Sequence, residues 1–372
     1  MVLDLSRARR GMEAAGLDCM VATTRENVHY SSGSNIMTID LLRRMAGVVI
    51  PLDRDPVFLV HANEEVTARE TTWIRDVRVY PGGEWEPLKP VEFLAEALRG
   101  MGLAQATIGV ETWAAPGAHL DCLRGLLPSA EFTDCGPIFE RLRAVKTGEE
   151  IGVLGRAAMA TAKAITVAFE MARPGDTERE IARNMMDLAF EYGADGIAFM
   201  VLAAGENIFE THHTPGGYRI REGDLLHTDF GGWFDGYLSD ISRMAVVGEP
   251  DDDQSKAYRF AVEAERAAAE TLTAGNRVME VHEAAREFYE SRGVAYGRAF
   301  IGHGIGLGCH EAPFLGPSHG DWLLEPGMVF EVEPSVTFGR ARMHTEDTFL
   351  VTENGPEILS DYRDTTEIQV IR

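Results

Sequence analysis

The chain has 372 residues, a length that favours two domains over one. Its 35 lysines and arginines stand against 59 aspartates and glutamates, which gives a formal net charge of -24. A surface this acidic repels nucleic acid and anionic membranes, so we expect neither as a partner.

The first twenty residues break their apolar positions with charges such as Asp4 and Arg7, and no apolar run elsewhere is expected to reach membrane-spanning length. The four cysteines lack the close spacing of metal ligands and are too few for a disulfide framework: Cys19, Cys122, Cys135 and Cys309. We therefore expect reduced, mostly buried thiols in a soluble protein of the cytoplasm.

Residues 1–145 alternate helical stretches with short β-rich segments, a pattern typical of an α/β domain. Nothing in this part concentrates reactive residues. The charged segment RLRAVKTGEEIG then leads into a long helical run, which predicts a second domain over 146–372. The strands predicted in the first domain are LDCMVAT (17–23), MAGVVIPL (45–52), DPVFLVHA (55–62), DVRVY (76–80) and ATIGVET (106–112).

The second domain contains an internal repeat. Residues 173–193 align with residues 273–293 at a fixed offset of 100, and each copy follows another long predicted helix, 148–171 and 252–272. Thr177 and Glu180 have the spacing of a capping box, which marks a helix start. We expect two related helix-helix-sheet halves about a pseudo-twofold axis, with a site at the seam between them.

The stretch LLHTDFGGWFDGYLSDISR (225–243) predicts a β-hairpin that turns at Asp235-Gly236. In that register residue 229 faces residue 242, so Asp229 and Asp240 become diagonal neighbours on one face of the hairpin. Aspartate is depleted in strands and costly to bury without a partner. Two converging aspartates therefore need an explanation.

A second hairpin is predicted in FEVEPSVTFGRARMHTEDTFLV (330–351), where a turn at Gly339-Arg340 sets Glu333 opposite Glu346. Four inward-facing carboxylates repel one another unless they are protonated or neutralised by cations. Two divalent cations balance four negative charges. Oxygen ligands with one imidazole suit manganese, cobalt, zinc or iron, and FIGHGIGLGCHEAP (300–313) offers His303 and His310.

These segments, in this order, resemble the creatinase, prolidase and aminopeptidase P family of pita-bread metallohydrolases. The resemblance covers nearly the whole chain and rests on REGDLLHTDFGGWFDGYLSDISR, GHGIGLGCHEAP, EPGMVFEVEPS and MHTEDTFLVTENG. It implies an α/β N-terminal domain followed by an α+β pita-bread domain with a pseudo-twofold repeat. The implied activity is cleavage of Xaa-Pro peptide bonds, as an Xaa-Pro dipeptidase or an aminopeptidase P, on small peptide substrates that contain proline.

The resemblance also implies the ligands of two divalent metal ions. Asp229 would chelate one ion, Asp240 and Glu346 would bridge both, and His303 and Glu333 would complete the second. A hydroxide between the ions would be the nucleophile, and Glu333 would act as general base. Manganese is the first choice of ion, with cobalt, zinc or iron as alternatives.

Three further histidines take roles from the resemblance. His310 matches a histidine that contacts substrate, and His212 matches one that stabilises the tetrahedral intermediate, with His213 as the fallback for a shift of one residue. Members of the family form homodimers in which the N-terminal domain caps the partner's site. We therefore expect a homodimer, with Trp73 and Trp85 as candidate contacts.

Two positions depart from the family pattern. His344 stands where many proline-cleaving relatives have an arginine, so either Arg340 or Arg342 compensates or the substrate differs. His227, two residues before Asp229, is either a donor to a metal ligand or an ordinary core histidine.

His344 also keeps other functions open. The rival is a small-molecule enzyme on the same scaffold, such as a hydrolase of cyclic amidines or a lyase acting on a sulfonium osmolyte. Metal-free creatinase-like chemistry and a binding protein with decayed ligands are both disfavoured, because all five ligand positions are intact.

Overall fold

The structure is a computed structural model that describes residues 3–82 and 85–372. Its contacts divide the chain between Arg143 and Ala144 into two units, which we call the N-terminal unit and the C-terminal unit. The division lies two residues before the predicted boundary.

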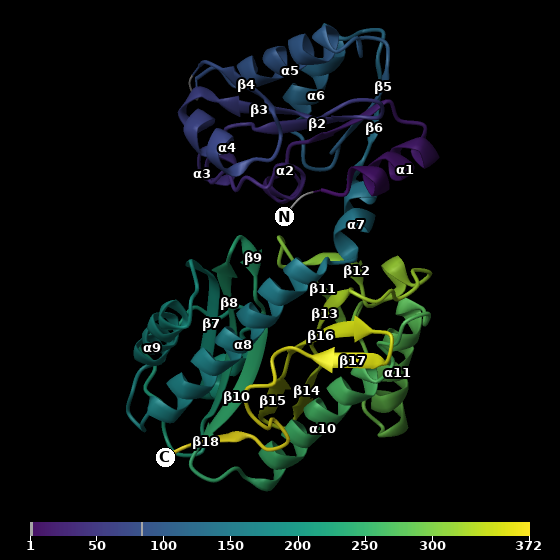
Figure 1. Ribbon diagram of the computed structural model, residues 1–372. Coiled ribbons are helices and arrows are strands. Elements are labelled where there is room, and N and C mark those ends of the chain that lie inside the picture. The colour runs from purple at the N-terminus through teal and green to yellow at the C-terminus, as the bar shows by residue number, and fades with distance from the viewer. Residues whose placement is uncertain (1–2, 83–84) are drawn as a thin grey trace. The chain divides into compact units, whose positions relative to one another are not determined.

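The N-terminal unit is built on a six-stranded sheet of order β4-β3-β2-β1-β5-β6, in which β1, β5 and β6 run parallel (Figure 1). All five predicted strands form. The sixth, β6, was not predicted because its sequence EFTD is short and polar and stays mostly exposed. The strands are β1 (Cys19–Ala22), β2 (Gly47–Pro51), β3 (Val57–His61), β4 (Asp76–Tyr80), β5 (Thr107–Val110) and β6 (Glu131–Asp134).

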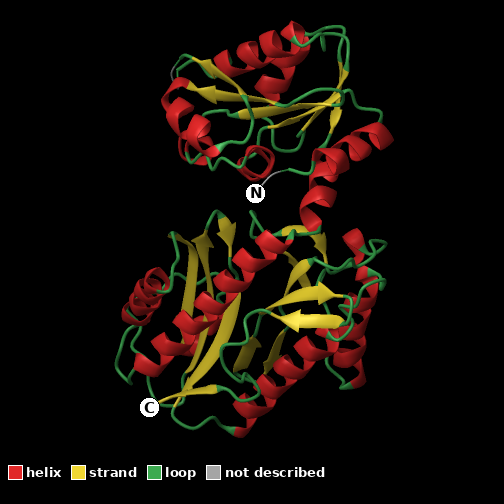
Figure 2. Ribbon diagram, in the orientation of Figure 1, coloured by secondary structure: helices red, strands yellow, loops and turns green. Residues whose placement is uncertain are grey.

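Helices cover both faces of this sheet. The apolar sides of α5 and α6 pack on one face, and α2 lies on the opposite face (Figures 1 and 2). The α/β prediction for this part of the chain is confirmed. The helices are α1 (Leu5–Ala15), α2 (Arg25–Ser32), α3 (Thr38–Leu42), α4 (Glu65–Thr71), α5 (Lys89–Gly100), α6 (Gly117–Leu126) and α7 (Gly136–Ala144).

Two helix pairs carry the repeat of the C-terminal unit. The second helix of each pair is 14 residues long, and the two start 100 residues apart, as the sequence repeat predicts. The predicted capping box of Thr177 and Glu180 is present. The pairs are α8 (Gly148–Met171) with α9 (Glu178–Glu191), and α10 (Asp252–Ala269) with α11 (Val278–Ser291).

Helix α8 corrects one expectation. By length and composition alone it is long and apolar enough to cross a membrane, even with Arg156 and Lys163 inside it. The expectation that no segment reaches membrane-spanning length is therefore wrong. In the fold, 61% of its most apolar window is buried. It packs on β8, β10 and β18, which makes it a core helix of the C-terminal unit.

The C-terminal unit has two five-stranded sheets, joined by a bridge from Ser242 to Glu346; the second is antiparallel, and the first is mixed because β18 runs parallel to β10. Their orders are β18-β10-β8-β7, with β9 paired to β8, and β12-β11-β13-β16-β17; β14 and β15 form a separate pair. This is the α+β pita-bread arrangement with its internal repeat. The strands are β7 (Gly196–Ala204), β8 (Leu225–Phe234), β9 (Tyr237–Leu238), β10 (Ile241–Val247), β11 (Gly302–Gly304), β12 (Glu311–Phe314), β13 (Val329–Val332), β14 (Ser335–Phe338), β15 (Ala341–His344), β16 (Asp347–Thr352), β17 (Gly355–Ile358) and β18 (Gln369–Ile371).

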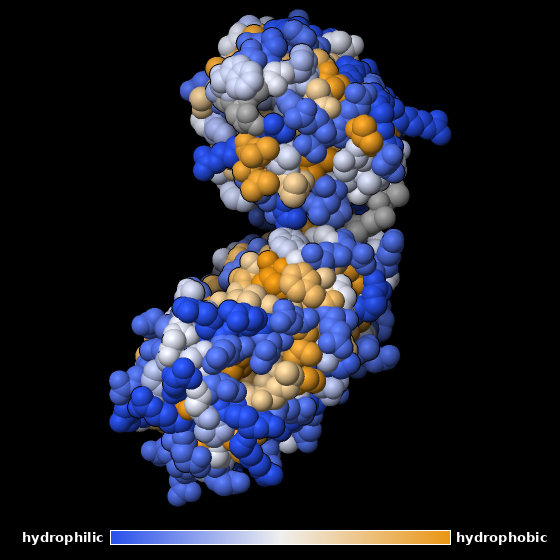
Figure 3. Space-filling model, turned by 90° about the vertical axis from the view of Figure 1, so that its left-hand side faces the viewer, coloured by the Kyte–Doolittle hydropathy of each residue, from blue (hydrophilic) through white to orange (hydrophobic). Residues whose placement is uncertain are grey.

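The molecular surface agrees with the composition. Hydrophilic residues cover much of the face shown in Figure 3, as a net charge of -24 requires. The exposed tryptophans are not the predicted pair. Trp85 is 80% exposed, but Trp73 is half-buried and donates its indole N–H to the Ser31 carbonyl, while Trp113 is 76% exposed.

Candidate metal centre

The first hairpin brings its two aspartates together. Asp229 on β8 lies opposite Ser242 on β10, and Asp235 and Gly236 form the turn with φ of 51° and 83°, so the predicted register is confirmed. Asp240 occupies the gap between β9 and β10. That gap needs Gly231 on the facing strand, because a Cβ there would lie 2.3 Å from the Ser239 carbonyl oxygen.

The second hairpin brings its two glutamates, Glu333 and Glu346, together. Strand pairs on both sides of a gap keep the predicted register, with Val332 opposite Asp347 and Ser335 opposite His344. Glu333 and Glu346 stand in that gap. The Glu346 backbone N–H donates to the Ser242 carbonyl oxygen at 3.2 Å, so this carboxylate is fixed at the seam of the two halves.

His303 comes from β11, next to β13. A Cβ on Gly302 would lie 2.0 Å from the Glu331 carbonyl oxygen, so glycine is what lets the strand approach so closely. The buried His303 ring places Nδ1 3.1 Å from the Gly304 carbonyl and Nε2 3.8 Å from Glu346 Oε1. Burial, with a smaller effect of His310, lowers the pKa of His303 to about 4, so the ring is neutral and can act as a ligand.

The seam therefore holds a set of metal donors. Atoms of Asp240, His303 and Glu346 lie within 4.8 Å of one another. Burial raises the pKa of Asp240, Glu346 and Asp229; neighbouring carboxylates raise it further for Asp240 and Glu346, whereas His344 and a hydrogen bond with Asp240 oppose the rise for Asp229. Among the described residues, buried Asp229 Oδ1 has no hydrogen-bond partner. Buried negative charge with an unpartnered oxygen is what divalent cations would neutralise, so the residues fit a metal centre.

Glu333 is held differently. Its Oε2 accepts hydrogen bonds from Arg298 at 2.8 Å and His344 at 3.3 Å. Burial alone would raise its pKa, but the hydrogen bond from His344 and the charge of Arg298 lower the pKa of Glu333 to about 2. This carboxylate is ionised throughout the neutral range, as a metal ligand must be.

The two unusual histidines form one chain of contacts to Glu333. His227 Nε2 lies 3.0 Å from Ser242 Oγ and 3.1 Å from His344 Nδ1, and His344 Nε2 reaches Glu333. His227 thus acts on the site through His344. The two rings are tilted by 52° with centroids 5.2 Å apart.

An arginine outside the motifs lies beside Glu333. Arg298 contacts both Glu333 and the Ser335 hydroxyl. The two arginines considered from the sequence are engaged elsewhere: Arg340 pairs with exposed Glu206 at 2.8 Å, and Arg342 donates to the Ile208 carbonyl. The guanidinium at the site therefore comes from the loop between α11 and β11.

The remaining predicted histidines separate into two groups. His310 is exposed and stacks on His303 with ring centroids 3.8 Å apart, and exposed His212 is close enough to Asp229 to lower its pKa. His213 instead pairs with buried Glu178 at 3.0 Å and with Glu210 at 2.8 Å. His213 is thus engaged by two carboxylates, whereas His212 lies closer to the charge of Asp229.

Two contacts at the centre were not predicted. Cys309 Sγ donates to Asp240 Oδ2 at 2.9 Å, so one of the four free cysteines lies at the site; Cys19 and Cys135 are the two that are fully buried. Buried Arg243 pairs with Asp347 and donates to the Glu346 carbonyl oxygen at 2.6 Å. The sequence did indicate this contact, because an arginine within a run of buried strand residues needs an acidic partner.

Comparison with known families supports this reading of the site. Residues 153–353 match the model of metallopeptidase family M24, and residues 5–145 match the creatinase/prolidase N-terminal domain. The chain is 31% identical to the Xaa-Pro dipeptidase of Lactobacillus helveticus over 365 residues, which is 95% of each chain.

Solved structures agree. An Xaa-Pro dipeptidase from Bacillus anthracis superposes with a TM-score of 0.86 and 26% identity over 98% of each chain. Dipeptidase PepE from Mycobacterium ulcerans gives a TM-score of 0.85 and 29% identity over 99% of this chain and 96% of the other.

Proposed function

Because the chain belongs to metallopeptidase family M24 and carries the N-terminal domain of creatinases and prolidases, we propose that it is an Xaa-Pro dipeptidase. The relatives named above that match nearly the whole chain are dipeptidases, and two of the three are named for the Xaa-Pro bond. The same names speak against the alternative of an amidine hydrolase or a sulfonium lyase.

One observation carries the proposal: carboxylates from both halves of the repeat converge at the seam beside a neutral imidazole. The residues that would hold two divalent ions are Asp229, Asp240, His303, Glu333 and Glu346. With four carboxylates and one imidazole, the set suits manganese, and cobalt, zinc or iron are alternatives. Divalent ions held there lower the pKa of water and so supply a nucleophile at neutral pH.

Side chains of the protein carry out the proton transfer. Glu333 takes the proton of the attacking water and passes it to the leaving amine. A pKa of about 2 keeps the Glu333 carboxylate ionised at neutral pH and therefore free to accept a proton. Arg298 and His344 keep the Glu333 oxygen oriented.

Two histidines meet the substrate. His310, exposed above His303, contacts the bound peptide. His212 donates a hydrogen bond to the peptide carbonyl oxygen as negative charge develops on it, which stabilises the transition state more than the bound substrate.

We also propose a cytoplasmic homodimer. Four free cysteines suit a reducing compartment. The exposed indoles of Trp85 and Trp113 support a contact made through the N-terminal unit, since aromatic residues are enriched at interfaces. Light scattering at micromolar concentration tests the dimer, and a monomer contradicts it.

The activity is tested with a peptide panel on protein loaded with manganese, cobalt or zinc. We expect hydrolysis of Ala-Pro and Leu-Pro, little of Ala-Ala, and slower cleavage of Ala-Pro-Ala. The variant Asp240→Asn should be inactive, and Glu353→Gln, an exposed acidic residue, should match the wild type. Preference for the tripeptide would indicate an aminopeptidase P. Turnover of a cyclic amidine with no peptide cleaved would overturn the proposal.

A further inference from the structure

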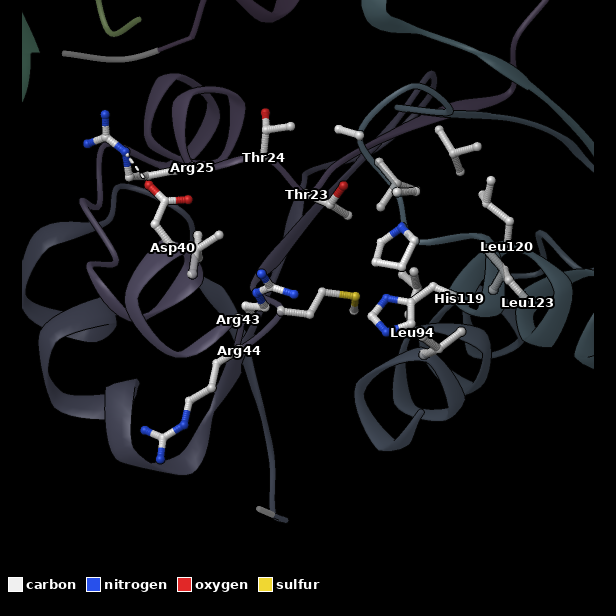
Figure 4. A pocket seen from close by; sticks show the side chains of 18 of the residues that line it. Thr23, Thr24, Arg25, Asp40, Arg43, Arg44, Leu94, His119, Leu120 and Leu123 are labelled. Carbon is white, nitrogen blue, oxygen red and sulfur yellow. Dashed lines mark ion pairs between the residues drawn. The ribbon is translucent and has the colours of Figure 1, made fainter. Parts of the chain in front are cut away.

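A cavity in the N-terminal unit is lined by residues of that unit. Its volume is about 410 Å³, within the range of roughly 300 to 1,000 Å³ typical of small-molecule sites. Figure 4 shows Arg25, Arg43 and Arg44 on one side, and Leu94, His119, Leu120 and Leu123 on the other. The proposed peptidase chemistry uses none of these side chains.

The cavity occupies a favoured place in an α/β sheet. Strands β1 and β5 are parallel neighbours, and the chain leaves their carboxyl ends toward opposite faces, to α2 from β1 and to α6 from β5. Loops that diverge in this way leave a crevice where open α/β sheets bind ligands. Thr23 and Thr24 after β1, and Ala114 to Pro116 after β5, form its edges.

The interior of the cavity is apolar. Val21 and Val110 contribute from the two strands, Leu94 from α5, and Leu120 and Leu123 from α6. These side chains extend the buried core between the sheet and the helices α5 and α6. A ligand that fills this space therefore needs an aliphatic or aromatic body.

The charged side of the cavity, which we call its mouth, carries exposed Arg43 together with Arg25, Arg44 and the carboxylates of Glu26 and Asp40. Arg25 is neutralised by Asp40 at 3.0 Å and Glu26 at 3.6 Å, and Arg44 lies 3.8 Å from Glu64. The Arg43 side chain makes no ion pair or hydrogen bond with another residue among those described in 3–82 and 85–372. In a chain with a net charge of -24, an arginine at the mouth of an apolar cavity is a specific feature.

The backbone conformation at Arg43 is fixed by the end of helix α3. Its φ of 52° lies in the left-handed region, which is uncommon for a residue other than glycine. Arg43 is the C-cap of α3, where helices commonly end in this conformation, and a backbone N–H at this cap donates to the Thr38 carbonyl oxygen. Figure 4 shows the Arg43 side chain among those that line the cavity.

The helix end beside the cavity does not supply the charge. Buried Glu111 accepts hydrogen bonds from Thr24 N at 2.9 Å, Thr24 Oγ1 at 2.6 Å and Asn27 Nδ2 at 2.6 Å, so a carboxylate of the protein already caps α2. Recognition of an anion in this cavity is left to the arginine side chain.

We propose that this cavity binds a monocarboxylate with an apolar body, its carboxylate paired with Arg43 and its body packed among Val21, Leu94, Val110 and Leu123. The planar guanidinium matches a carboxylate with two parallel hydrogen bonds. The site is independent of the metal centre and gives the N-terminal unit a binding function of its own.

The test is calorimetric titration of the full-length protein at low ionic strength with three probes. Octanoate should bind saturably at one site per chain. Octylamine, with the same body and the opposite charge, and acetate, with the charge but no body, should give no saturable heat. Absence of saturable octanoate binding, or octylamine binding as tightly as octanoate, would overturn the proposal.

Variants locate the site. Arg43→Ala should weaken octanoate binding about tenfold or more, since a hydrogen bond to a charged group contributes about 1.5 to 3 kcal/mol and tenfold corresponds to about 1.4 kcal/mol. Ala115→Phe, which narrows the cavity without changing charge, should abolish binding. Arg124→Ala on α6 is the matched control and should bind as the wild type does. Unchanged binding in Arg43→Ala would refute the assignment.

Discussion

Removal of metal should destabilise the C-terminal unit alone. A ligand present at 100 times its Kd stabilises the folded state by about 2.7 kcal/mol. In a unit of about 230 residues each kcal/mol shifts Tm by about 2 to 4 °C, so chelation should lower the Tm of the C-terminal unit by about 5 to 11 °C. The N-terminal unit carries none of the ligands, and its transition should not move.

The same shift should disappear in Asp240→Asn. Burial raises the pKa of Asp240, so its ionised form costs stability when no metal is bound. The metal-free variant should therefore be as stable as the metal-free wild type, or more stable, and should not respond to manganese. Glu353→Gln is the matched control that keeps the response.

The sign of the pH dependence follows from the same pKa values. Asp229, Asp240 and Glu346 have folded pKa values above their unfolded values, so the metal-free folded state binds more protons than the unfolded state. The metal-free protein should lose stability as pH rises from about 4 through the folded pKa values, and bound metal should remove that loss. Scanning calorimetry with and without chelator measures both effects. An equal Tm in the two states, or a manganese response in Asp240→Asn, would refute the reasoning.

Three further predictions concern single side chains. Arg298→Gln should weaken metal binding about 10- to 100-fold, measured by competition with a chelating dye; unchanged affinity contradicts its role. In a double-mutant cycle, the effects of His227→Ala and His344→Ala on the free energy of metal binding should differ from additivity by about 0.5 kcal/mol or more. Additive effects would mean that His227 does not act on the metal centre through His344. Burial lowers the pKa of His29 to about 4, so in the metal-loaded protein the stability that neutral His29 contributes should be lost as pH drops from 6.5 to 4. His29→Gln should remove that part of the pH slope in urea denaturation; an equal slope rules out His29 as its source.

The sequence predicted the centre of the molecule well because turns fix register. Asp235 and Gly236 adopt the positive φ values of a two-residue hairpin turn, and Gly339, in the turn of the second hairpin, has a φ of 57°. Counting from each turn therefore assigned every strand residue, including the carboxylates, a partner on the facing strand. Residue type and spacing brought the four carboxylates together and offered His303 and His310, and the family resemblance then named His303 as the fifth ligand.

What the sequence did not reveal were contacts made by tertiary packing. Arg298 lies 35 residues before Glu333 in an irregular loop, where no periodicity indicates which way a side chain points. The polar strand β6 pairs with β5 although its own side chains bury little surface. Trp73 looked exposed by residue type, yet its indole finds a carbonyl partner inside its own unit.

The metal centre is tested most directly by anomalous diffraction from crystals of the protein grown with manganese. Two strong peaks per chain should lie at the seam of the C-terminal unit, both within reach of Asp240 and Glu346, one beside Asp229 and the other between His303 and Glu333. No peak at the seam, or peaks away from these five side chains, would contradict the account.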